Sequence, residues 1–142
     1  MQSSEDIMSH CLTEGGCLCG ALRYGLRGAP TVSMICHCRT CRRAAGSPTV
    51  AWLTCSAENF SWIRGRPAEF ASSPPVVRTF CASCGTPLTY THAERPSEVD
   101  VTTCTLDNPE AFPPTYHAWV SHDLAWVRFG DGLTAYHAAK EG

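Results

Sequence analysis

The sequence predicts a mainly β, single-domain protein built from short strands, and three observations support this prediction. Short runs of β-branched or alternating apolar residues recur along the chain, a pattern typical of partly buried strands. Turns rich in glycine and proline separate these runs. Helical patterns are weak, so we expect no more than isolated helical turns.

The first half of the chain contains three predicted strands. In residues 21–26, leucine and tyrosine side chains alternate with smaller or charged ones, which places the large apolar groups on one face. Residues 31–36 are rich in β-branched types and run directly into a group of cysteines. Residues 49–54 place a valine and a tryptophan on the same parity, so both are expected on one face of a third strand.

The second half follows the same style. Three further strands are predicted at residues 76–80, 86–92 and 98–104. In the last of them, two valines oppose an aspartate and a threonine, again with a period of two. The predicted turns are the segments 28–30, 65–67, 73–75, 107–109 and 113–114.

Two short helical turns are expected between these strands. Thr40 is the predicted N-cap of a turn that Gly46 ends. Ser56 is the predicted N-cap of a second turn, with Glu58 nearby.

Composition and charge limit the functions to consider. The 142 residues suit one domain, with a flexible tail expected at residues 1–9 and a folded domain at residues 10–142. The net charge of -2 predicts no basic face, so nucleic acid is not an expected partner. No apolar run approaches the roughly 20 residues of a membrane span, and the first residues do not form a signal peptide. We therefore expect a cytoplasmic protein without a membrane partner.

The ten cysteines are the strongest chemical signal in the sequence. In a reducing compartment, clustered cysteines indicate a metal site or catalysis rather than a disulfide framework. Seven of them form three groups, which are Cys17 with Cys19, Cys36 with Cys38 and Cys41, and Cys81 with Cys84. Side chains two residues apart on a strand share a face about 6.6 Å apart, a spacing that suits two thiolates on one zinc ion better than a disulfide.

The outer two groups predict a closed, structural zinc site. Cys81 and Cys84 form a Cys-x-x-Cys pair followed by glycine, which is the form of a zinc knuckle and supplies two ligands. Cys17 and Cys19 supply a second pair between flanking glycines. Four thiolates on one ion would connect the first strand to a turn more than 60 residues later, so metal binding would contribute to folding.

The middle group predicts a second zinc site with an open position. Cys36, Cys38 and Cys41 are three ligands without an obvious fourth, which is the form of a catalytic zinc site. Thr40 as N-cap would place Cys41 at a helix N-terminus, where a thiolate is favoured. The alternatives are a reduced, buried thiol cluster, or exchange of these cysteines with those of the first site.

Three arginines beside the middle group add positive charge. An anionic substrate that carries a thiol would suit such a site. Arg42 and Arg43 are therefore candidate substrate contacts, and the alternative for both is solvated surface charge.

Other cysteine, histidine and tryptophan residues are expected to have structural roles. The cysteines interpreted as small core or surface residues are Cys11, Cys55 and Cys104. His37 alternates away from the cysteines on either side of it, while His117 and His122 are interpreted as packed or solvated rather than as ligands. The tryptophans expected in the core are Trp52, Trp62, Trp119 and Trp126.

Five segments, taken together and in order, resemble a known family: "GGCLCGALRY", "CHCRTCRRAAGSP", "RTFCASCGTPLTY", "TLDNP" and "HAWVSHDLAW". They resemble the glutathione-dependent formaldehyde-activating enzyme family, which also includes the centromere protein V-like domains. The resemblance extends from about residue 10 to residue 136, and its arrangement of seven cysteines is highly specific.

The resemblance implies a β-tent fold of short antiparallel strands with two zinc ions per chain. The implied ligands are Cys17, Cys19, Cys81 and Cys84 for a structural zinc, and Cys36, Cys38 and Cys41 for a second zinc where the reaction takes place. The activity of the family joins formaldehyde to glutathione as S-hydroxymethylglutathione. In the reverse direction this is a carbon–sulfur lyase reaction.

The function predicted on this basis is that of a zinc-dependent carbon–sulfur lyase. Its substrate would be a small thiol–aldehyde adduct such as S-hydroxymethylglutathione, with glutathione or a similar thiol as partner. The alternative is a non-catalytic, zinc-stabilised module for protein or nucleic-acid interaction, and the negative charge counts against a DNA role. A third hypothesis, a thiol redox protein, requires a nucleophilic cysteine outside both metal sites, for which Cys55 and Cys104 are the candidates.

Overall fold

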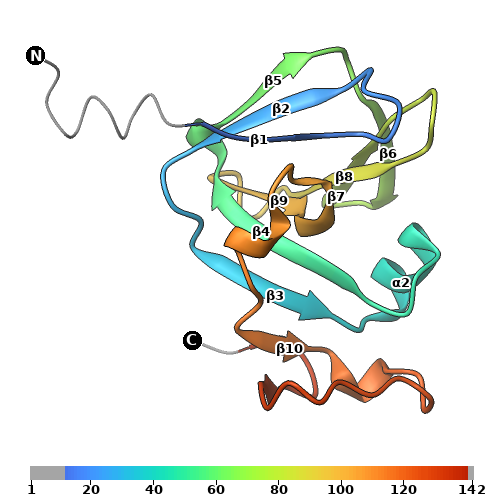
Figure 1. The fold of residues 1–142 in the computed structure, drawn as a ribbon. Coiled ribbons are helices and arrows are strands. Elements are labelled where there is room, and N and C mark those ends of the chain that lie inside the picture. The colour runs from blue at the N-terminus through green and yellow to red at the C-terminus, as the bar shows by residue number, and fades with distance from the viewer. Residues whose placement is uncertain (1–11, 141–142) are drawn as a thin grey trace, which may run out of the picture.

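The computed structural model of the protein describes residues 12–140, which form two β-sheets (Figure 1). The small antiparallel sheet has the order β1-β2-β5, from β1 (Leu12–Gly16), β2 (Arg23–Arg27) and β5 (Phe60–Arg64). The predicted tail at residues 1–9 lies outside the described residues. The boundaries of the domain therefore stay a prediction.

The large sheet has the strand order β11-β10-β3-β4-β9-β8-β7-β6. Its strands are β3 (Val32–Cys36), β4 (Val50–Ser56), β6 (Ala68–Ser73), β7 (Val76–Phe80), β8 (Pro87–His92), β9 (Glu98–Thr102), β10 (Tyr116–Ala118) and β11 (Thr134–Ala135). Short helices complete the elements: α2 (Arg39–Ala45), η1 (Ala57–Asn59), η2 (Thr103–Thr105), η3 (Pro109–Ala111) and η4 (Val120–His122). The prediction of a mainly β fold is confirmed.

The six predicted strands correspond to β2, β3, β4, β7, β8 and β9. Four of the strands that the pattern missed, β1, β5, β6 and β11, lie at the edges of the two sheets. An edge strand has a partner on one side only, so burial imposes a weaker apolar pattern on it. The expectation of antiparallel pairing needs one correction, because β10 is parallel to both β3 and β11. The long connection from β9 through η2 and η3 permits this crossover.

The helical turn after β3 begins earlier than predicted. Cys38, rather than Thr40, is the N-cap of α2, because its backbone is extended and its Sγ accepts a hydrogen bond from the Cys41 amide at 3.2 Å. Gly46 ends the helix with φ of 62°, as predicted, and Ser56 precedes η1 as its N-cap. Cys41 therefore lies within the first turn of α2 and not at its first residue.

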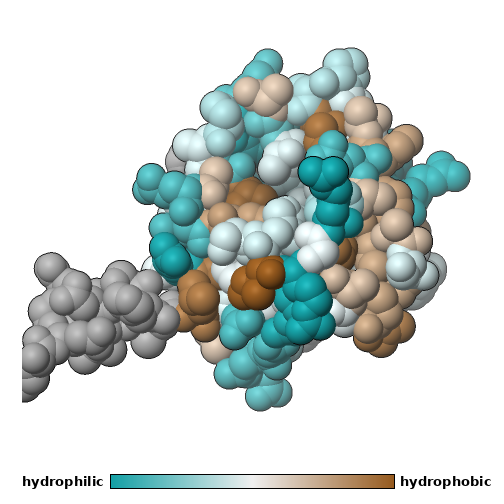
Figure 2. All heavy atoms as spheres, turned by 90° about the horizontal axis from the view of Figure 1, so that it is seen from above, coloured by the Kyte–Doolittle hydropathy of each residue, from teal (hydrophilic) through white to brown (hydrophobic). Residues whose placement is uncertain are grey.

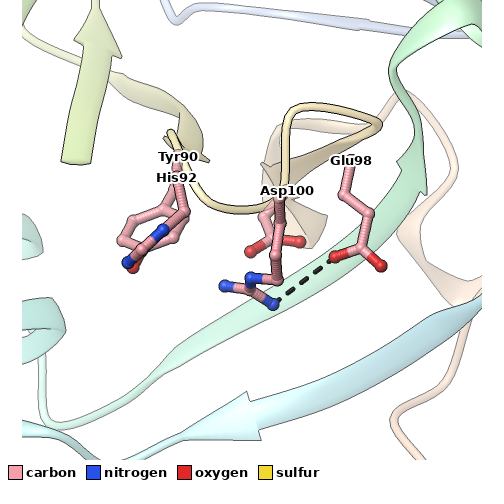
Figure 3. A pocket seen from close by; sticks show the side chains of 5 residues that line it. Tyr90, His92, Glu98 and Asp100 are labelled. Atoms are coloured by element: carbon pink, nitrogen blue, oxygen red, sulfur yellow. Dashed lines mark hydrogen bonds and ion pairs between the residues drawn. The ribbon is translucent and has the colours of Figure 1, made fainter. Parts of the chain in front are cut away.

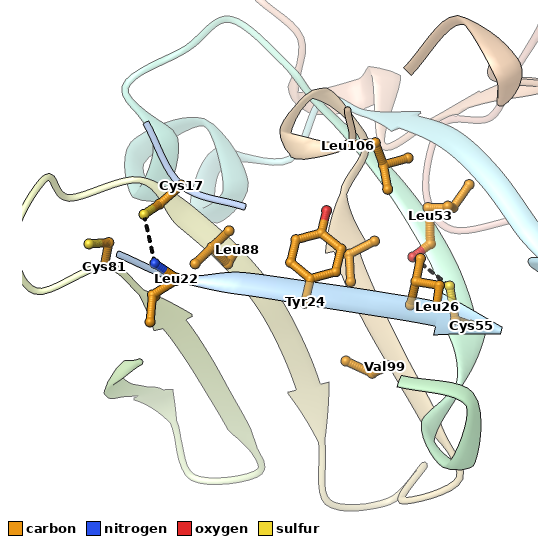
Figure 4. Close-up of a cluster of buried hydrophobic side chains, with 11 residues drawn as sticks. Cys17, Leu22, Tyr24, Leu26, Leu53, Cys55, Cys81, Leu88, Val99 and Leu106 are labelled. Carbon is orange, nitrogen blue, oxygen red and sulfur yellow. Dashed lines mark hydrogen bonds between the residues drawn. The ribbon is translucent and has the colours of Figure 1, made fainter. Parts of the chain in front are cut away.

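The main core lies between the small sheet and the middle of the large sheet (Figure 4). Tyr24 and Leu26 of β2, with Leu22 just before the strand, face this core. Tyr24 is completely buried, and the two leucines are only 3% exposed. The Tyr24 hydroxyl forms a hydrogen bond of 2.8 Å with the Thr105 hydroxyl. Gly15 permits this arrangement, because a Cβ there would lie 2.5 Å from the Tyr24 hydroxyl oxygen.

The tryptophans occupy three different environments. Trp52 is buried on β4, while Trp62 and Trp119 are half-buried against the core clusters. Trp126 is 71% exposed, so the expectation that it belongs to the core is wrong. It lies in a turn after η4, outside any strand that would bring it against a sheet.

The outer face of the small sheet mixes hydrophilic and apolar side chains (Figure 2). Its exposed apolar residues include Leu12 and Ile63, whose side chains flank Gly25. Within residues 12–140, no helix has the length and apolar character that a membrane crossing requires.

Candidate metal centres

Two pairs of cysteines from distant turns meet at one end of the main core. Cys17 and Cys19 follow β1, whereas Cys81 and Cys84 lie between β7 and β8. The Cys19 Sγ is 3.6 Å from that of Cys17 and 3.7 Å from that of Cys81, and all four sulfur atoms lie within 4.8 Å of one another. Figure 4 shows Cys17 and Cys81 side by side beyond Leu22. We call these residues the four-cysteine group.

The two turns of this group are built alike. A glycine with positive φ directly follows each pair of cysteines. These glycines are Gly20, with φ of 80°, and Gly85, with φ of 81°. In each turn, the first sulfur accepts a backbone hydrogen bond, from the Leu22 amide to Cys17 at 3.2 Å and from the Cys84 amide to Cys81 at 3.4 Å. Amide donors directed at sulfur favour thiolates, which are the form that binds metal.

Thr86 connects the two turns, a role that no sequence pattern indicated. Its hydroxyl oxygen accepts a hydrogen bond from the Leu18 amide at 3.1 Å and lies 3.2 Å from the Cys84 sulfur. Because the oxygen accepts from Leu18, its own proton is available to Cys84. The hydroxyl and the Thr86 amide together lower the pKa of Cys84 to about 5.

The three-cysteine group comprises Cys36, Cys38 and Cys41, whose sulfur atoms also lie within 4.8 Å of one another. Cys36 ends β3, and the other two belong to the beginning of α2. Cys36 and Cys41 are buried against Val50 and Trp52 of β4, while Cys38 is half-buried. The group is therefore accessible on the side of Cys38.

The proton distribution in this group suits a cation. Hydrogen bonds from the Cys36 and Cys41 thiols lower the pKa of Cys38 to about 2. The same contact with Cys38 raises the pKa of Cys36. One thiolate is thus stabilised by two thiol protons, which a divalent ion would replace. Sets of four and of three sulfur donors are typical of zinc sites, so both groups fit that metal.

Arg78, on β7, approaches the three-cysteine group from the other end of the large sheet. Its Nη2 is 3.8 Å from the Cys41 sulfur, and its guanidinium carbon lies 5.0 Å from the centre of the Tyr90 ring. Its Nε donates to the Ser72 hydroxyl at 3.3 Å. Within residues 12–140, no carboxylate forms an ion pair with Arg78. This cation therefore remains available to an anion at the site.

Sequence reasoning selected Arg42 and Arg43 and missed Arg78. Arg42 is half-buried and Arg43 is exposed, and in the described part of the chain neither side chain forms a hydrogen bond with a cysteine. Their role as substrate contacts stays a prediction. Arg78 could be found only from the strand register, because 37 residues separate it from Cys41.

A small pocket adjoins this site across the sheet (Figure 3). Strand register places Arg78 opposite Tyr90, and Tyr90 opposite Asp100. Tyr90 and Asp100 line the pocket with His92, Arg95 and Glu98. Burial raises the pKa of Asp100, although the Thr54 hydroxyl donates to its carboxylate at 2.6 Å. A cation, an aromatic ring and a carboxylate thus lie in one row.

Two buried histidines lie next to the three-cysteine group without joining it. His37 Nε2 is 2.9 Å from His117 Nδ1, and His117 Nε2 is 2.8 Å from the Asp131 carboxylate. His37 indeed points away from the adjacent cysteines, and His117 is packed, as the sequence predicts. The hydrogen-bonded chain itself was not predicted. His122 stacks on Trp119 with a ring separation of 5.2 Å.

The cysteines outside the two groups have different surroundings. Cys55 is buried in the main core, and Cys104 is exposed. Burial raises the pKa of Cys55 to about 12, which counts against a nucleophilic role in the redox hypothesis. Cys11 lies outside the described residues.

The family model described as glutathione-dependent formaldehyde-activating enzyme matches residues 12–122. The chain belongs to this family. All seven cysteines of the two groups lie within the matched residues. Membership in the glutathione-dependent formaldehyde-activating enzyme family confirms the resemblance seen in the sequence.

Two relatives extend this comparison. A Schizosaccharomyces pombe protein named as an uncharacterized lyase is 36% identical over 86 residues, which are 58% of this chain and 61% of the relative. The match thus spans less than two thirds of that relative's length. A crystal structure of a Rhodobacter sphaeroides protein is 19% identical with a TM-score of 0.57, and the alignment covers 87% of this chain and 98% of that one. At this identity, the likeness shows a shared fold.

Proposed function

We propose that this protein is a zinc-dependent carbon–sulfur lyase that acts on a small thiol–aldehyde adduct such as S-hydroxymethylglutathione. The observation that carries the proposal is the convergence of three cysteine sulfurs with the guanidinium of Arg78, which forms no ion pair within residues 12–140, in a member of this family. Within residues 12–140, no guanidinium forms a hydrogen bond with a sulfur of the four-cysteine group, which would bind a structural zinc.

The reaction breaks two bonds, carbon–sulfur and oxygen–hydrogen, and forms the carbon–oxygen π bond of formaldehyde, while the released proton passes to solvent. In the lyase direction, the carbon–sulfur bond of the adduct breaks and its electron pair stays on sulfur as a thiolate. The hydroxyl group of the adduct loses its proton, and its carbon–oxygen bond becomes the double bond of formaldehyde. Negative charge therefore develops on the thiol sulfur.

The three-cysteine group supports this chemistry in two ways. A zinc ion bound by Cys36, Cys38 and Cys41 would supply Lewis-acid chemistry and would stabilise a thiolate. Arg78 places a positive charge 3.8 Å from the Cys41 sulfur, close to where the charge of the departing thiolate develops. Because Arg78 is fixed by Ser72 and Tyr90, little reorganisation accompanies the reaction.

The neighbouring pocket suits a thiol that carries both charges. Asp100 can accept hydrogen bonds from an ammonium group, whereas Arg95 and Arg78 can donate to carboxylates. Glutathione has one amino group and two carboxylates. We propose this pocket, with Arg42 and Arg43 as further candidate contacts, as the binding region for the thiol part of the substrate.

The remaining parts of the proposal follow from the cysteines. Unmodified thiol ligands require a reducing compartment, so we propose a cytoplasmic location.

We propose neither nucleic acid nor a membrane as partner. At physiological salt, this protein should bind duplex DNA no more tightly than an acidic control protein binds it. Sub-micromolar DNA binding that weakens steeply with salt would favour a zinc-stabilised interaction module instead.

Turnover of formaldehyde and glutathione tests the proposed activity. Zinc-loaded protein should accelerate both formation and cleavage of S-hydroxymethylglutathione above the spontaneous rate, measured by exchange NMR at equilibrium. Cys104→Ser should behave like the native protein, because Cys104 is exposed and outside both groups. If fully zinc-loaded protein gives only the spontaneous rate, the lyase proposal is wrong for this adduct.

A further inference from the structure

Three side chains form a continuous hydrogen-bonded chain from the protein surface to the middle of the three-cysteine segment. Asp131 binds His117, and His117 binds His37, which lies between Cys36 and Cys38. Both histidines are only 3% exposed. The ring of Phe129 covers them, with its centre 5.6 Å from that of His37 and 4.8 Å from that of His117.

The carboxylate sets the proton positions along this chain. A carboxylate only accepts hydrogen bonds, so Nε2 of His117 must carry a proton and donate it to Asp131. In neutral His117, Nδ1 then has no proton and accepts from Nε2 of His37. One exposed carboxylate thus fixes the orientation of two buried rings.

The backbone reinforces the same connection. Strand β10 is parallel to β3, with Ala118 beside Cys36 in the register. The His37 amide donates to the Ala118 carbonyl at 2.9 Å. The backbone on both sides of His117 is therefore bonded to the strand that presents Cys36. Figure 1 shows this C-terminal part of the chain lying along β3.

The chain of histidines is a poor solution for packing alone. His37 Nδ1 is buried and has no hydrogen-bond partner among the described residues. A partly satisfied polar network in a core is less stable than apolar side chains of similar volume. This cost indicates that the chain serves the adjacent site. Asp131 also lies beyond the family match, which ends at residue 122, whereas both histidines lie within it.

We propose that Asp131 and His117 are positioning residues that act through His37 to fix the Cys36–Cys38 segment, and thereby determine how tightly the three-cysteine group binds its metal ion. The inference rests on the proposed zinc site of that group. It assigns a role in metal retention to the C-terminal segment, which contributes no metal ligand itself. Partners that orient a metal site from outside its ligand set typically contribute about 10- to 100-fold to metal affinity.

Chelator competition on the zinc-loaded, full-length protein tests this role. The native protein should release one zinc ion at a low concentration of a chromophoric chelator and the second at a higher concentration. In Asp131→Ala, the first release should need about 10-fold less chelator, and the second should be unchanged. Asp131→Asn should recover part of the loss, because its amide oxygen still accepts from His117.

Asp123→Ala is the matched control. Asp123 is exposed in the same segment and also places a charge near His37, but its side chain is not part of the hydrogen-bonded chain. This variant should release zinc as the native protein does. If Asp131→Ala releases zinc like Asp123→Ala, or if both ions of Asp131→Ala become equally labile, the positioning role is wrong. If Asp131→Ala does not fold, zinc release from Asp131→Asn is compared with zinc release from Asp123→Asn in the same way.

The test also separates this inference from the proposed function. Cys41→Ser identifies the first ion released, because that variant should lack it. If Cys41→Ser still binds two zinc ions, the zinc site itself is wrong. If Asp131→Ala binds two zinc ions and releases them as the native protein does, only the positioning role of Asp131 and His117 is contradicted. No substrate is present, so the result does not depend on lyase activity.

Discussion

The four-cysteine group takes its thiols from two distant turns, and Cys81 lies 62 positions after Cys19 in the chain. The three-cysteine group, in contrast, takes all of its thiols from residues 36–41. The first group connects the small sheet to the large sheet at one end of the main core. The second lies on one sheet, and its next neighbour is the guanidinium of Arg78 rather than a fourth thiol.

The same ligand type can therefore serve stability or chemistry, depending on which segments of the chain it connects. A metal ion between distant segments reduces the freedom of the unfolded chain and contributes directly to folding. An ion within one short segment contributes little to long-range order, and three ligands leave a position for a substrate.

The largest effect is expected from Cys84→Ser. Loss of one ligand would leave an under-coordinated ion between the two sheets, so the free energy of unfolding should fall by about 5 kcal/mol. Thermal and urea unfolding against Cys104→Ser, which removes an exposed thiol outside both groups, measure this change. Equal stability of the two variants would show that the four-cysteine group does not join the sheets.

Cys41→Ser should lower activity strongly but stability only slightly. Two of three ligands would remain, so the variant should lose one zinc ion, and turnover should fall by at least about 100-fold. Its unfolding transition should stay close to that of the native protein. Unfolding as severe as that of Cys84→Ser would contradict the open-site assignment, and full activity would place the chemistry elsewhere.

Arg78→Met should lower kcat/KM by about 10- to 100-fold while both zinc ions remain bound. The reason is loss of the positive charge next to the developing thiolate, so Arg78→Lys should recover part of the activity. Arg66→Met is the control, because Arg66 is an exposed cation outside both cysteine groups and outside the pocket. Equal losses in the two methionine variants would indicate general attraction of an anionic substrate rather than a contact at the reaction centre.

The smallest effect is expected from Asp107→Asn. Arg23 of β2 binds the Asp107 carboxylate at 2.9 and 2.5 Å, a second connection between the small sheet and the rest of the chain. Arg23 lowers the pKa of Asp107, so the pair stabilises the protein above the ordinary carboxyl pKa and the contribution disappears as pH falls through the lowered value. Because both groups contact solvent, the loss at pH 7 should be about 0.5 kcal/mol.

Urea unfolding of Asp107→Asn and native protein at pH 7 and at about pH 3, below the ordinary carboxyl pKa, measures this difference. The difference in the free energy of unfolding between the two proteins should be smaller at the lower pH. A loss at pH 7 as large as that of Cys84→Ser would mean that the ion pair, and not the cysteines, connects the sheets.

The two cysteine groups were predictable because their chemistry is encoded in local spacing. Cys-x-Cys and Cys-x-x-Cys pairs carry their geometry with them, and the structure brings together the sets that the sequence proposes. Alternation likewise predicted the buried face of β2 correctly, with Tyr24 at its centre.

Features that depend on strand order were not predictable. Arg78 reaches Cys41 only because β7 and β8 follow β9 across the large sheet. The His37–His117 pair exists only because β10 returns parallel to β3, and a three-residue strand carries almost no pattern of its own. Trp126 was misplaced because hydrophobicity alone does not show which segments lack a partner.

The most direct test of the contrast is the zinc content of the native protein before and after treatment with a weak chelator. Protein purified without chelator should contain two zinc ions per chain, and treatment should remove one of them without unfolding the domain, as followed by circular dichroism. One zinc ion or fewer before treatment, or release of both ions together with loss of the fold, would contradict the division into a structural and an open metal site.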